Sequence, residues 1–304
     1  MIDESPTLVI DANYLGYQAV YTTGELSHED VGTGVVFGFL NRILYLGQLF
    51  KTNDLVFCWD SRHSHRRALF PGYKANRRDK TPEQQEIVEE AYRQFHSLRR
   101  IDLPSIGFLN VLMQSGLEAD DIIAKIVIGK LGDFIIVSAD HDLYQVLANN
   151  VRMYNPSTNV MMTSKRFREE YGIYEGKWNV VKAIAGCTSD NIPGVSGVGE
   201  SFVIRYLTGE LTSGKKYDAI WNRDMDTYAR NIELVSLPHP DTEEPQLGGN
   251  NFDIEGLKDV ADRHGLDSFH DRIDEWQSFM EGKFDGTNKK KQKRAGRRGR
   301  RSRG

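Results

Sequence analysis

The chain has 304 residues, of which 39% are hydrophobic and 27% are charged, and its formal net charge is −4. This length allows one large domain or two modest ones, and the composition is that of an ordinary globular protein. No apolar run approaches the roughly 20 residues of a membrane-spanning helix, so we expect no membrane segment. The acidic start, MIDESPTLVIDAN, lacks a basic segment followed by an apolar one, so we expect no secretory signal. Cys58 and Cys187 lie far apart in the sequence, which indicates a reducing compartment rather than a disulfide framework.

The charge is unevenly distributed along the chain. The last sixteen residues, KKKQKRAGRRGRRSRG, contain four Lys, six Arg and no acidic residue. Removing these ten positive charges from the net charge of −4 leaves −14 on the rest of the chain. We expect residues 289–304 to be a disordered basic tail, because they have no apolar periodicity, and to bind polyanions. A solubilising or cloning-derived end is the alternative interpretation.

Three short apolar runs predict the strands of a sheet, and helical patterns lie between them. The runs occur in TLVIDAN (residues 7–13), DLVFCWDS (54–61) and DFIIVSADHD (133–142). Each is continuous rather than alternating and rich in β-branched or aromatic residues, which is typical of strands buried on both faces. Apolar residues recur three and four apart in residues 34–50 and 118–131, as they do in helices. We therefore expect an α/β fold with a mostly parallel central sheet.

Aspartates follow each of the predicted strands. Asp11 and Asp60 come at the ends of the first two runs, and Asp140 and Asp142 lie just past the third. In an open parallel sheet, ligands bind beyond the carboxyl ends of the strands. We therefore expect these four carboxylates to converge on one edge of the sheet.

Three more acids, Glu118, Asp120 and Asp121, open the predicted helix at residues 118–131. The helix dipole stabilises an acid in the first turn by about 0.3–1 kcal/mol, and this alone would account for them. It does not account for four further aspartates at the same edge. Carboxylates packed together repel one another unless cations lie among them. Oxygen ligands without a paired set of His and Cys favour Mg²⁺ or Mn²⁺ over zinc.

Two such ions about 4 Å apart can hold the attacking and the leaving oxygen of a phosphodiester. The acids therefore predict metal-dependent phosphodiester hydrolysis that needs no Ser, Cys or His nucleophile. His141, inside SADHDLYQ, is a candidate general base. Side chains alternate along an extended stretch, so we expect it to point away from Asp140 and Asp142 and interpret it as a structural or surface histidine.

Two segments indicate a nucleic-acid substrate. Residues 61–100 are rich in Arg and Lys, with Phe70 and Tyr73 among them. Lys and Arg side chains can bind phosphates, and aromatic rings can stack on bases. A solvated helical face with ordinary ion pairs would fit this composition equally well. The second segment is the glycine-rich turn SDNIPGVSGVGES at residues 189–201. A turn of this kind before a helix directs backbone N–H groups toward a phosphate.

The motifs IDAN, WDS, YKANR, LEADD, SADHDLYQ and SDNIPGVSGVG, followed by TYARNIELVSL, occur in this order along the chain. Their order and spacing resemble those of the flap endonuclease and 5′-nuclease family. That family includes the bacteriophage 5′-exonucleases, the phage RNase H nucleases and the 5′-nuclease domain of bacterial DNA polymerase I. The resemblance extends from about residue 7 to about residue 237, and the chain length is most like that of the phage proteins.

The resemblance implies a fold and an activity. The fold would be a PIN-like nuclease core at residues 1–180, with a helical arch at about 61–100 that admits a single-stranded 5′ end. A C-terminal helical subdomain at 181–288 would contain a helix–three-turn–helix motif at about 183–207, which holds duplex DNA and often a K⁺ ion. The activity would be that of a structure-selective, divalent-metal-dependent 5′-3′ exonuclease and flap endonuclease in phage DNA replication and RNA primer removal. Its expected partners are branched or 5′-ended DNA, RNA–DNA hybrids, and replication proteins such as a single-strand-binding protein, a polymerase or a clamp, and the protein itself would be a monomer.

The resemblance also implies roles for individual residues. The first metal would be held by Asp11, Asp60, Glu118 and Asp120, the second by Asp140, Asp142 and Asp190, and Asp121 would support the site by capping a helix. Lys74 and Arg77 of YKANR would be the catalytic cations that stabilise charge at the scissile phosphate. Tyr73 would stack on a nucleotide. The other nucleic-acid contacts would come from Arg66, Arg67, Gly194, Gly197, Gly199, Ser201, Lys289, Lys290, Lys291, Arg297 and Arg298.

The chain departs from the family pattern at one position. The family has Gly-Asp-x-x-Asp-Asn before the glycine-rich turn, whereas residues 186–191 read GCTSDN, so Cys187 replaces an acid. Cysteine is a poor ligand for Mg²⁺, so we expect a weakened second metal site. The alternative is that Cys187 is a small buried residue facing the core.

Other functions remain open on the sequence alone. One is a branched-DNA-binding protein whose catalysis is impaired by Cys187, and the other is a PIN-type endoribonuclease, although small PIN nucleases do not usually carry a helix–three-turn–helix. We assign no chemistry to residues 238–288, which begin as a loop and continue into helical patterns such as DIEGLKDVADRHG. The tail resembles a nuclear-import signal, but the phage-like length favours the cytoplasm of a bacterial host cell.

Overall fold

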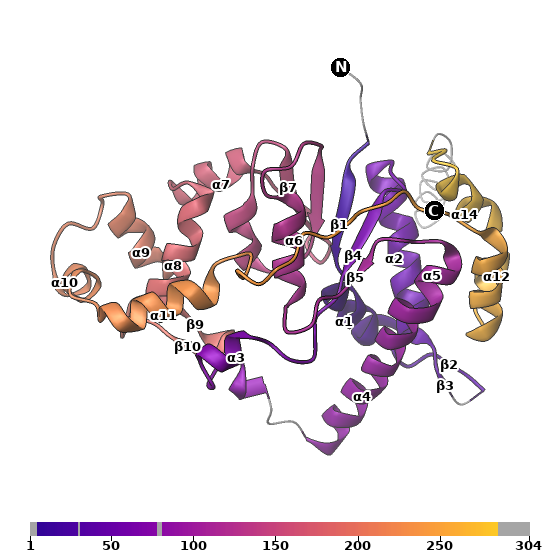
Figure 1. Ribbon diagram of the computed structural model, residues 1–304, viewed down its shortest axis with the longest axis horizontal. Helices are drawn as coiled ribbons and strands as arrows, with labels where there is room; N and C mark the ends of the chain where they lie inside the picture. The colour runs from indigo at the N-terminus through magenta and orange to yellow at the C-terminus, as the bar shows by residue number, and fades with distance from the viewer. Residues whose placement is uncertain (1–4, 30, 78–80, 285–304) are drawn as a thin grey trace, which may run out of the picture.

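A six-stranded sheet runs through the middle of the molecule, in the order β5-β4-β1-β6-β7-β8 (Figure 1). The structure is a computed structural model that describes residues 5–29, 31–77 and 81–284. β1 (Thr7–Asp11) pairs in parallel with β4 (Leu55–Cys58) and with β6 (Phe134–Val137). β5 (Val111–Leu112) and β7 (Val151–Asn155) extend the parallel sheet, and β8 (Val160–Met162) is antiparallel at its edge. The predicted mostly parallel α/β fold is confirmed. The three apolar runs of the sequence form β1, β4 and β6, which are adjacent in the sheet.

Side chains of the strands pack in two separate hydrophobic cores, one on each face of the sheet. Leu8 and Ile10 of β1 enter one core, whereas Val9 enters the other, because successive side chains of a strand point to opposite faces. α1 (Ala12–Thr23) and α2 (Gly34–Phe50) pack in the first core, and α6 (Ala119–Val127) packs in the second. A short hairpin of β2 (Ser27–His28) and β3 (Val31–Gly32) connects α1 to α2.

The two long helices predicted from apolar periodicity are present. α2 spans residues 34–50, as predicted. α6 begins at Ala119 but ends at Val127 rather than at residue 131, because Ile128 is extended and Gly129 takes a φ of 68°. The acids of the predicted helix start therefore stand at the N-terminus of α6, beside the carboxyl ends of β1 and β4.

The segment between β4 and β5 leaves the sheet and returns to it. Its first part holds α3 (Arg66–Leu69) and the 3₁₀ turn η1 (Ala75–Arg77), and its second part is α4 (Pro82–Ser97). α4 begins with a capping box in which the Thr81 hydroxyl accepts from the Gln84 N–H and the Gln84 side chain accepts from the Thr81 N–H. A π-helical turn, η2 (Leu98–Asp102), then leads into α5 (Leu103–Ile106). We call residues 61–77 and 81–97 the strap; in Figure 1 its α4 part projects away from the sheet.

The chain after β6 builds the other end of the molecule. The 3₁₀ turn η3 (His141–Val146) follows β6, and α7 (Ser164–Tyr171), η4 (Glu175–Lys177) and α8 (Trp178–Ala185) follow β8. A short hairpin of β9 (Gly186–Cys187) and β10 (Ile192–Pro193) encloses η5 (Thr188–Asp190). α9 (Glu200–Leu207), α10 (Lys215–Trp221) and α11 (Met225–Val235) complete this end. The glycine-rich turn thus lies between α8 and α9.

The last three helices do not join this end, which corrects the prediction of one subdomain at 181–288. α12 (Ile254–Arg263), α13 (Asp267–His270) and α14 (Ile273–Met280) lie at the opposite end, beside α2 and α5 (Figure 1). Their apolar side chains belong to the first core. The chain crosses over because backbone bonds join Asn251 N–H to Gly107 O at 2.9 Å and Asp253 N–H to Ile106 O at 3.0 Å. Gly107 permits this approach, since a Cβ there would lie 1.9 Å from Asn251 O.

Among the residues that the structure describes, no helix is both long enough and apolar enough to cross a bilayer.

We expect Phe279→Ala to lower the free energy of unfolding of the whole chain by about 3–5 kcal/mol. Phe279 is 1% exposed and its ring packs against those of Phe108, Phe252 and Trp276, so truncation leaves a cavity in the first core. Leu131→Ala, at a side chain that is 98% exposed, is the matched control and should change little. Chemical denaturation measures both. A loss confined to a separate early transition would contradict a shared core.

Candidate active site

The acids predicted to converge do meet at one edge of the sheet. Asp11 ends β1, and its carboxylate accepts from Tyr14 N–H and from the Ser138 hydroxyl, each at 2.9 Å. The Asp60 carboxylate accepts from Ala119 N–H at 2.8 Å, which joins the end of β4 to the start of α6. Asp140, beyond β6, accepts from the N–H of Asp142 at 2.9 Å and begins η3. Each carboxylate is thus held by the backbone of an element next to its own strand.

These carboxylates disfavour one another's ionisation. Burial and the neighbouring charges of Asp60 and Asp140 raise the pKa of Asp11 to about 7, although two hydrogen bonds to its carboxylate lower it. Burial, and then the charges of Asp140, Asp11 and Asp60, raise the pKa of Asp120 well above its ordinary value. Desolvation by the surrounding protein raises the pKa of Asp60, although part of its side chain is exposed to solvent, and the charge of Glu118 adds to this effect. An edge built in this way favours protonation or a bound cation near neutral pH, and its oxygen donors fit hard divalent cations.

Glu118 differs from its neighbours because cations already lie beside it. Its carboxylate accepts from Lys74 Nζ at 2.7 Å and from the Tyr73 hydroxyl at 2.9 Å. Burial alone would raise the pKa of Glu118, but the charges of Lys74 and Arg66 and these hydrogen bonds outweigh burial and lower it. Tyr73 is only 3% exposed, so its ring is not available for the base stacking predicted from the sequence. The sequence prediction missed that the hydroxyl of Tyr73 has a carboxylate partner.

Asp121, unlike the other acids at the start of α6, forms a buried ion pair with Arg66. Two hydrogen bonds join the guanidinium and the carboxylate at 2.6 and 2.7 Å, and the side chains are 3% and 0% exposed. The Asp121 carboxylate also accepts from Glu118 N–H at 3.2 Å, which caps α6. The helix-capping position predicted for Asp121 is therefore observed. Arg66, by contrast, was predicted to contact nucleic acid and is instead an internal partner of this acid, whereas its neighbour Arg67 is partly exposed.

Asp142, Cys187 and Asp190 form a second group, in which the candidate ligand atoms lie within 4.8 Å of one another. Burial and the charge of Asp140 raise the pKa of Asp142 to about 6. Burial raises the pKa of the Cys187 thiol, although its contact with the Ser189 hydroxyl at 3.1 Å lowers it. Cys187 lies beside these carboxylates and also packs in a small apolar cluster. Its surroundings therefore agree in part with a position in the second metal site and in part with a small buried residue facing the core.

Lys182 also contacts this second group, and our sequence prediction missed it. Its Nζ lies 3.0 Å from Asp142 Oδ1 and 3.2 Å from Glu200 Oε1, and the residue is 9% exposed. Burial works against the charged amine, but the charge of Asp142 prevails and raises the pKa of Lys182. The available signal was a lysine on the apolar helix pattern WNVVKAIA, because a buried cation requires an acidic partner.

The strap docks beside this second group. Arg77 donates to Asp190 Oδ1 at 2.6 Å and to Ser189 O at 3.2 Å, and Lys74 N–H donates to Asp190 O at 2.8 Å. Lys74 adopts a φ of 53°, in the left-handed region that is uncommon for a lysine. Both YKANR cations thus lie at the acidic edge, each on a different carboxylate.

The glycines of the turn between α8 and α9 differ in what they do. Gly194 permits a close approach of β10 to α8, since a Cβ there would lie 2.1 Å from Ala185 O. Gly197 takes a φ of 69°, and its carbonyl accepts from Lys216 Nζ. Gly199 is exposed at the start of α9 with nothing within 4 Å of an added Cβ, and Ser201 is exposed one residue into the helix after Glu200. Only Gly199 and Ser201 present an open helix start.

His141 takes no part in the acidic edge, but the reason differs from the one predicted. It lies in η3 rather than in an extended stretch, because Asp140 caps that turn. Its ring is exposed and stacks on Tyr144, with centroids 4.6 Å apart. The tail residues predicted to bind nucleic acid, Lys289, Lys290, Lys291, Arg297 and Arg298, lie outside the described residues.

Comparisons with known proteins agree on one family. A family model described as "5'-3' exonuclease, N-terminal resolvase-like domain" matches residues 6–172. The 5′-3′ exonuclease of Buchnera aphidicola subsp. Schizaphis graminum is 30% identical over 256 residues, or 82% of this chain and 82% of that protein. DNA polymerase I of Caldicellulosiruptor bescii is 30% identical over 211 residues, or 66% of this chain and 24% of the polymerase.

A solved structure shares the fold. The flap endonuclease of bacteriophage T5, in a pseudo-enzyme-product complex with DNA and metal ions, superposes with a TM-score of 0.64 at 22% identity. The match covers 88% of this chain and 97% of that chain. The mostly parallel sheet with its helices is therefore the fold of that protein as well.

We expect the metal-free protein to lose stability as the pH rises from about 4 to about 7. Folding raises the pKa of Asp11 from 3.8 to about 7, so in this window the native state binds a proton that the unfolded chain releases, and its ionisation opposes folding. In EDTA, the melting temperature should therefore be higher at about pH 5.5 than at about pH 7.5. Asp11→Asn should reduce this difference, because an amide does not titrate.

Divalent cations should act in the opposite sense in the same melting experiments. Because they compete with protons for the carboxylates, Mg²⁺ or Mn²⁺ should raise the melting temperature more at about pH 7.5 than at about pH 5.5. A metal-free melting temperature that increases through this window would contradict the strained acidic edge.

Proposed function

This chain belongs to the 5′-3′ exonuclease family, and from that premise we propose that it is a structure-selective 5′ nuclease. It hydrolyses phosphodiesters near junctions between single-stranded and double-stranded DNA, as an exonuclease and as a flap endonuclease. The observation that carries this proposal is the edge where Asp11, Asp60 and Asp120 have raised pKa values beside the cations Lys74 and Arg77. A cluster of acids alone would indicate only a cation-binding site. Acids next to lysine and arginine side chains that can contact a phosphate indicate a phosphodiesterase.

We assign the acids to two divalent-cation sites. Asp11, Asp60, Glu118 and Asp120 would hold the first ion, and Asp140, Asp142 and Asp190 the second, with Cys187 beside it. The donor set is mainly carboxylate oxygen, which fits Mg²⁺ or Mn²⁺. Bound there, the ions supply a water of lowered pKa and positive charge for the oxygen that leaves.

The protein's own cations orient and neutralise the substrate. Lys74 and Arg77 are held by Glu118 and Asp190, so ions bound to those carboxylates would release both side chains toward a phosphate. Lys74 is 20% exposed and Arg77 is 54% exposed, so a substrate can reach them without unfolding the strap. Their charge would then stabilise the negative charge that grows as the bond breaks.

The DNA would lie across two parts of the surface. We propose that the strap is the arch that admits a 5′ end and that α8, the glycine-rich turn and α9 hold the duplex, with Gly199 and Ser201 at the phosphates. The fold shared with a T5 flap endonuclease in complex with DNA supports DNA as the ligand. K⁺ in the turn remains a prediction, and Lys216 already supplies a positive charge to the Gly197 carbonyl. The basic tail would add contacts that are independent of sequence.

We place the activity in DNA replication, where 5′ ends and RNA primers must be removed. The relatives named 5′-3′ exonuclease and DNA polymerase I support this placement. RNA–DNA hybrids are therefore proposed substrates beside branched DNA, and replication proteins are proposed partners of a monomeric enzyme.

The activity is tested with labelled 5′-flap, nicked-duplex and RNA–DNA hybrid substrates, with Mg²⁺ or with EDTA. We expect cleavage near the junction in Mg²⁺ and none in EDTA. Asp140→Asn should reduce cleavage to background while junction binding is retained, because the acid serves the metal rather than the fold. Asp259→Asn, at an exposed acid of α12, is the control and should cleave normally.

Lys74→Ala in the same assay should lower kcat by about 100- to 1,000-fold with little change in KM. Binding without cleavage by the unmodified protein would instead favour a branched-DNA-binding protein. Cleavage of single-stranded RNA in preference to the flap would favour an endoribonuclease.

We expect Cys187→Asp to shift the Mg²⁺ activation curve to lower concentration, by roughly tenfold, because affinity for a hard ion follows the number and charge of its oxygen ligands. The unmodified protein should accordingly respond more strongly to Mn²⁺ than to Mg²⁺. Cys187→Asn, which has the shape of the aspartate without its charge, is the control and should not shift the curve. An unmoved curve together with a lower melting temperature would show that the new carboxylate is only an unpaired buried charge.

A further inference from the structure

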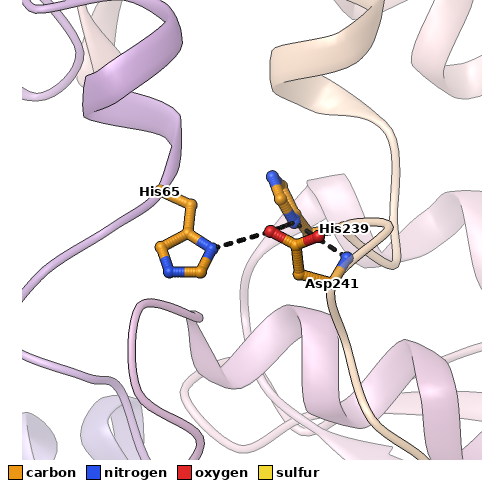
Figure 2. Close-up of side chains that lie close together, drawn as sticks. All are labelled: His65, His239 and Asp241. Atoms are coloured by element: carbon orange, nitrogen blue, oxygen red, sulfur yellow. Dashed lines mark hydrogen bonds and ion pairs between the residues drawn. The ribbon is translucent and has the colours of Figure 1, made fainter.

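Two histidines and an aspartate that are not among the acids of the active site converge on the surface (Figure 2). His65 lies in the strap, directly before α3, and His239 and Asp241 lie in the loop that leads from α11 to α12. The Nδ1 atoms of His65 and His239 lie 3.0 and 3.7 Å from the same oxygen, Asp241 Oδ2. Segments far apart in the sequence thus present three metal-binding side chains to one point.

The spacing of these atoms is that of ligands around a small ion. Ligands at about 2.0–2.1 Å from a tetrahedral Zn²⁺ lie roughly 3.3 Å from one another. The two distances to Asp241 Oδ2 fall on either side of this value, and the three candidate ligand atoms all lie within 4.8 Å of one another. An ion could therefore enter with only small side-chain movements.

Hydrogen bonds already orient the donors. His239 Nδ1 accepts from Asp241 N–H at 3.2 Å, so this nitrogen is the unprotonated one of the ring, and a bound metal would replace that N–H as the partner of its lone pair. The backbone N–H of His65 donates to Gly116 O at 2.8 Å, and its ring packs over Gly116, where a Cβ would lie 1.9 Å from His65 Nε2. The Nδ1 edge of His65 is thereby turned toward Asp241.

The backbone beneath His239 is equally fixed. His239 N–H donates to Asp121 Oδ1 at 2.8 Å, and the Thr242 hydroxyl donates to His239 O at 2.7 Å. Ligands positioned in advance lose little conformational entropy when the metal binds. The His65 and Asp241 side chains are 47% and 63% exposed, so water can complete the coordination.

We propose that His65, His239 and Asp241 bind a Zn²⁺-like transition-metal ion, which clamps the base of the strap to the loop before α12. Two imidazoles and one carboxylate prefer such ions to Mg²⁺, so this site and the carboxylate sites select different metals. The ion would stabilise the packing of His65 and Arg66 against the loop. The proposal does not depend on nuclease activity, and its test measures binding and stability rather than cleavage.

The test is a Zn²⁺ titration of the metal-free full-length protein in excess Mg²⁺, which competes with Zn²⁺ for the carboxylate sites. We expect one Zn²⁺ to bind and to raise the melting temperature. His65→Gln/His239→Gln should weaken this binding by roughly 100-fold or more, since second-shell losses alone cost 10- to 100-fold. Its metal-free melting temperature should stay close to that of the unmodified chain, because the backbone bond from residue 239 to Asp121 remains and an exposed ion pair contributes little.

A Cys187→Ser variant separates this site from the second group of the active site. It should bind Zn²⁺ as tightly as the unmodified protein, and bound Co²⁺ should show visible absorption without a sulfur-to-metal charge-transfer band. The proposal is overturned if the double His variant keeps the site, if Cys187→Ser loses it, or if no tight binding occurs.

Discussion

The buried pair of Arg66 and Asp121 is the interaction on which the arrangement of the site depends. Arg66 also donates to Leu234 O at 2.7 Å, and Asp121 also accepts from the N–H groups of Glu118 and His239. One ion pair thus joins the strap, the first turn of α6 and the chain after α11. Because a buried charge without its partner is strongly destabilising, these segments are held together wherever the pair forms. The position of Glu118 and Asp120 at the acidic edge follows from this constraint.

The same edge shows how stability and function compete. Lys74 pairs with Glu118, Arg77 with Asp190, and Lys182 with Asp142 and Glu200. Of the acids at this edge, Glu118 is the one whose pKa is lowered as a result. Asp11 and Asp120 keep raised pKa values because burial and like charges act on them together. The protein therefore carries an unfavourable arrangement that divalent cations can relieve. Under the function that we propose, those ions would also release Lys74 and Arg77 to a substrate. Lys182 lies in the second group, where Cys187 replaces an acid of the family pattern and so supplies no negative charge beside it.

Much of the site could be predicted from the sequence because it depends on local patterns. Short apolar runs predict buried strands, and the carboxyl ends of parallel strands must meet at one edge, so Asp11, Asp60 and Asp140 could be placed together. The side of a helix or strap that faces inward could not be predicted in the same way. Arg66 and Tyr73 have the composition of a nucleic-acid surface, yet both are buried against Asp121 and Glu118. Residues 238–288 were expected to begin as a loop and continue into helices, and α12, α13 and α14 are those helices. Their return to the first core depends on backbone contacts with residues 106–107 that no local pattern encodes.

The sequence by itself determined the parallel α/β sheet, the acids at its carboxyl edge and the family, because these depend on residue type, periodicity and motif order. Only the tertiary structure decided which charges are partners. It assigned Arg66 to Asp121, Lys74 to Glu118, Arg77 to Asp190 and Lys182 to Asp142. It also brought His65 and His239 together across the fold. The physical reason is that an ion pair or a metal site depends on distances of a few ångströms between side chains, and for residues far apart in the chain those distances are fixed only when the elements pack.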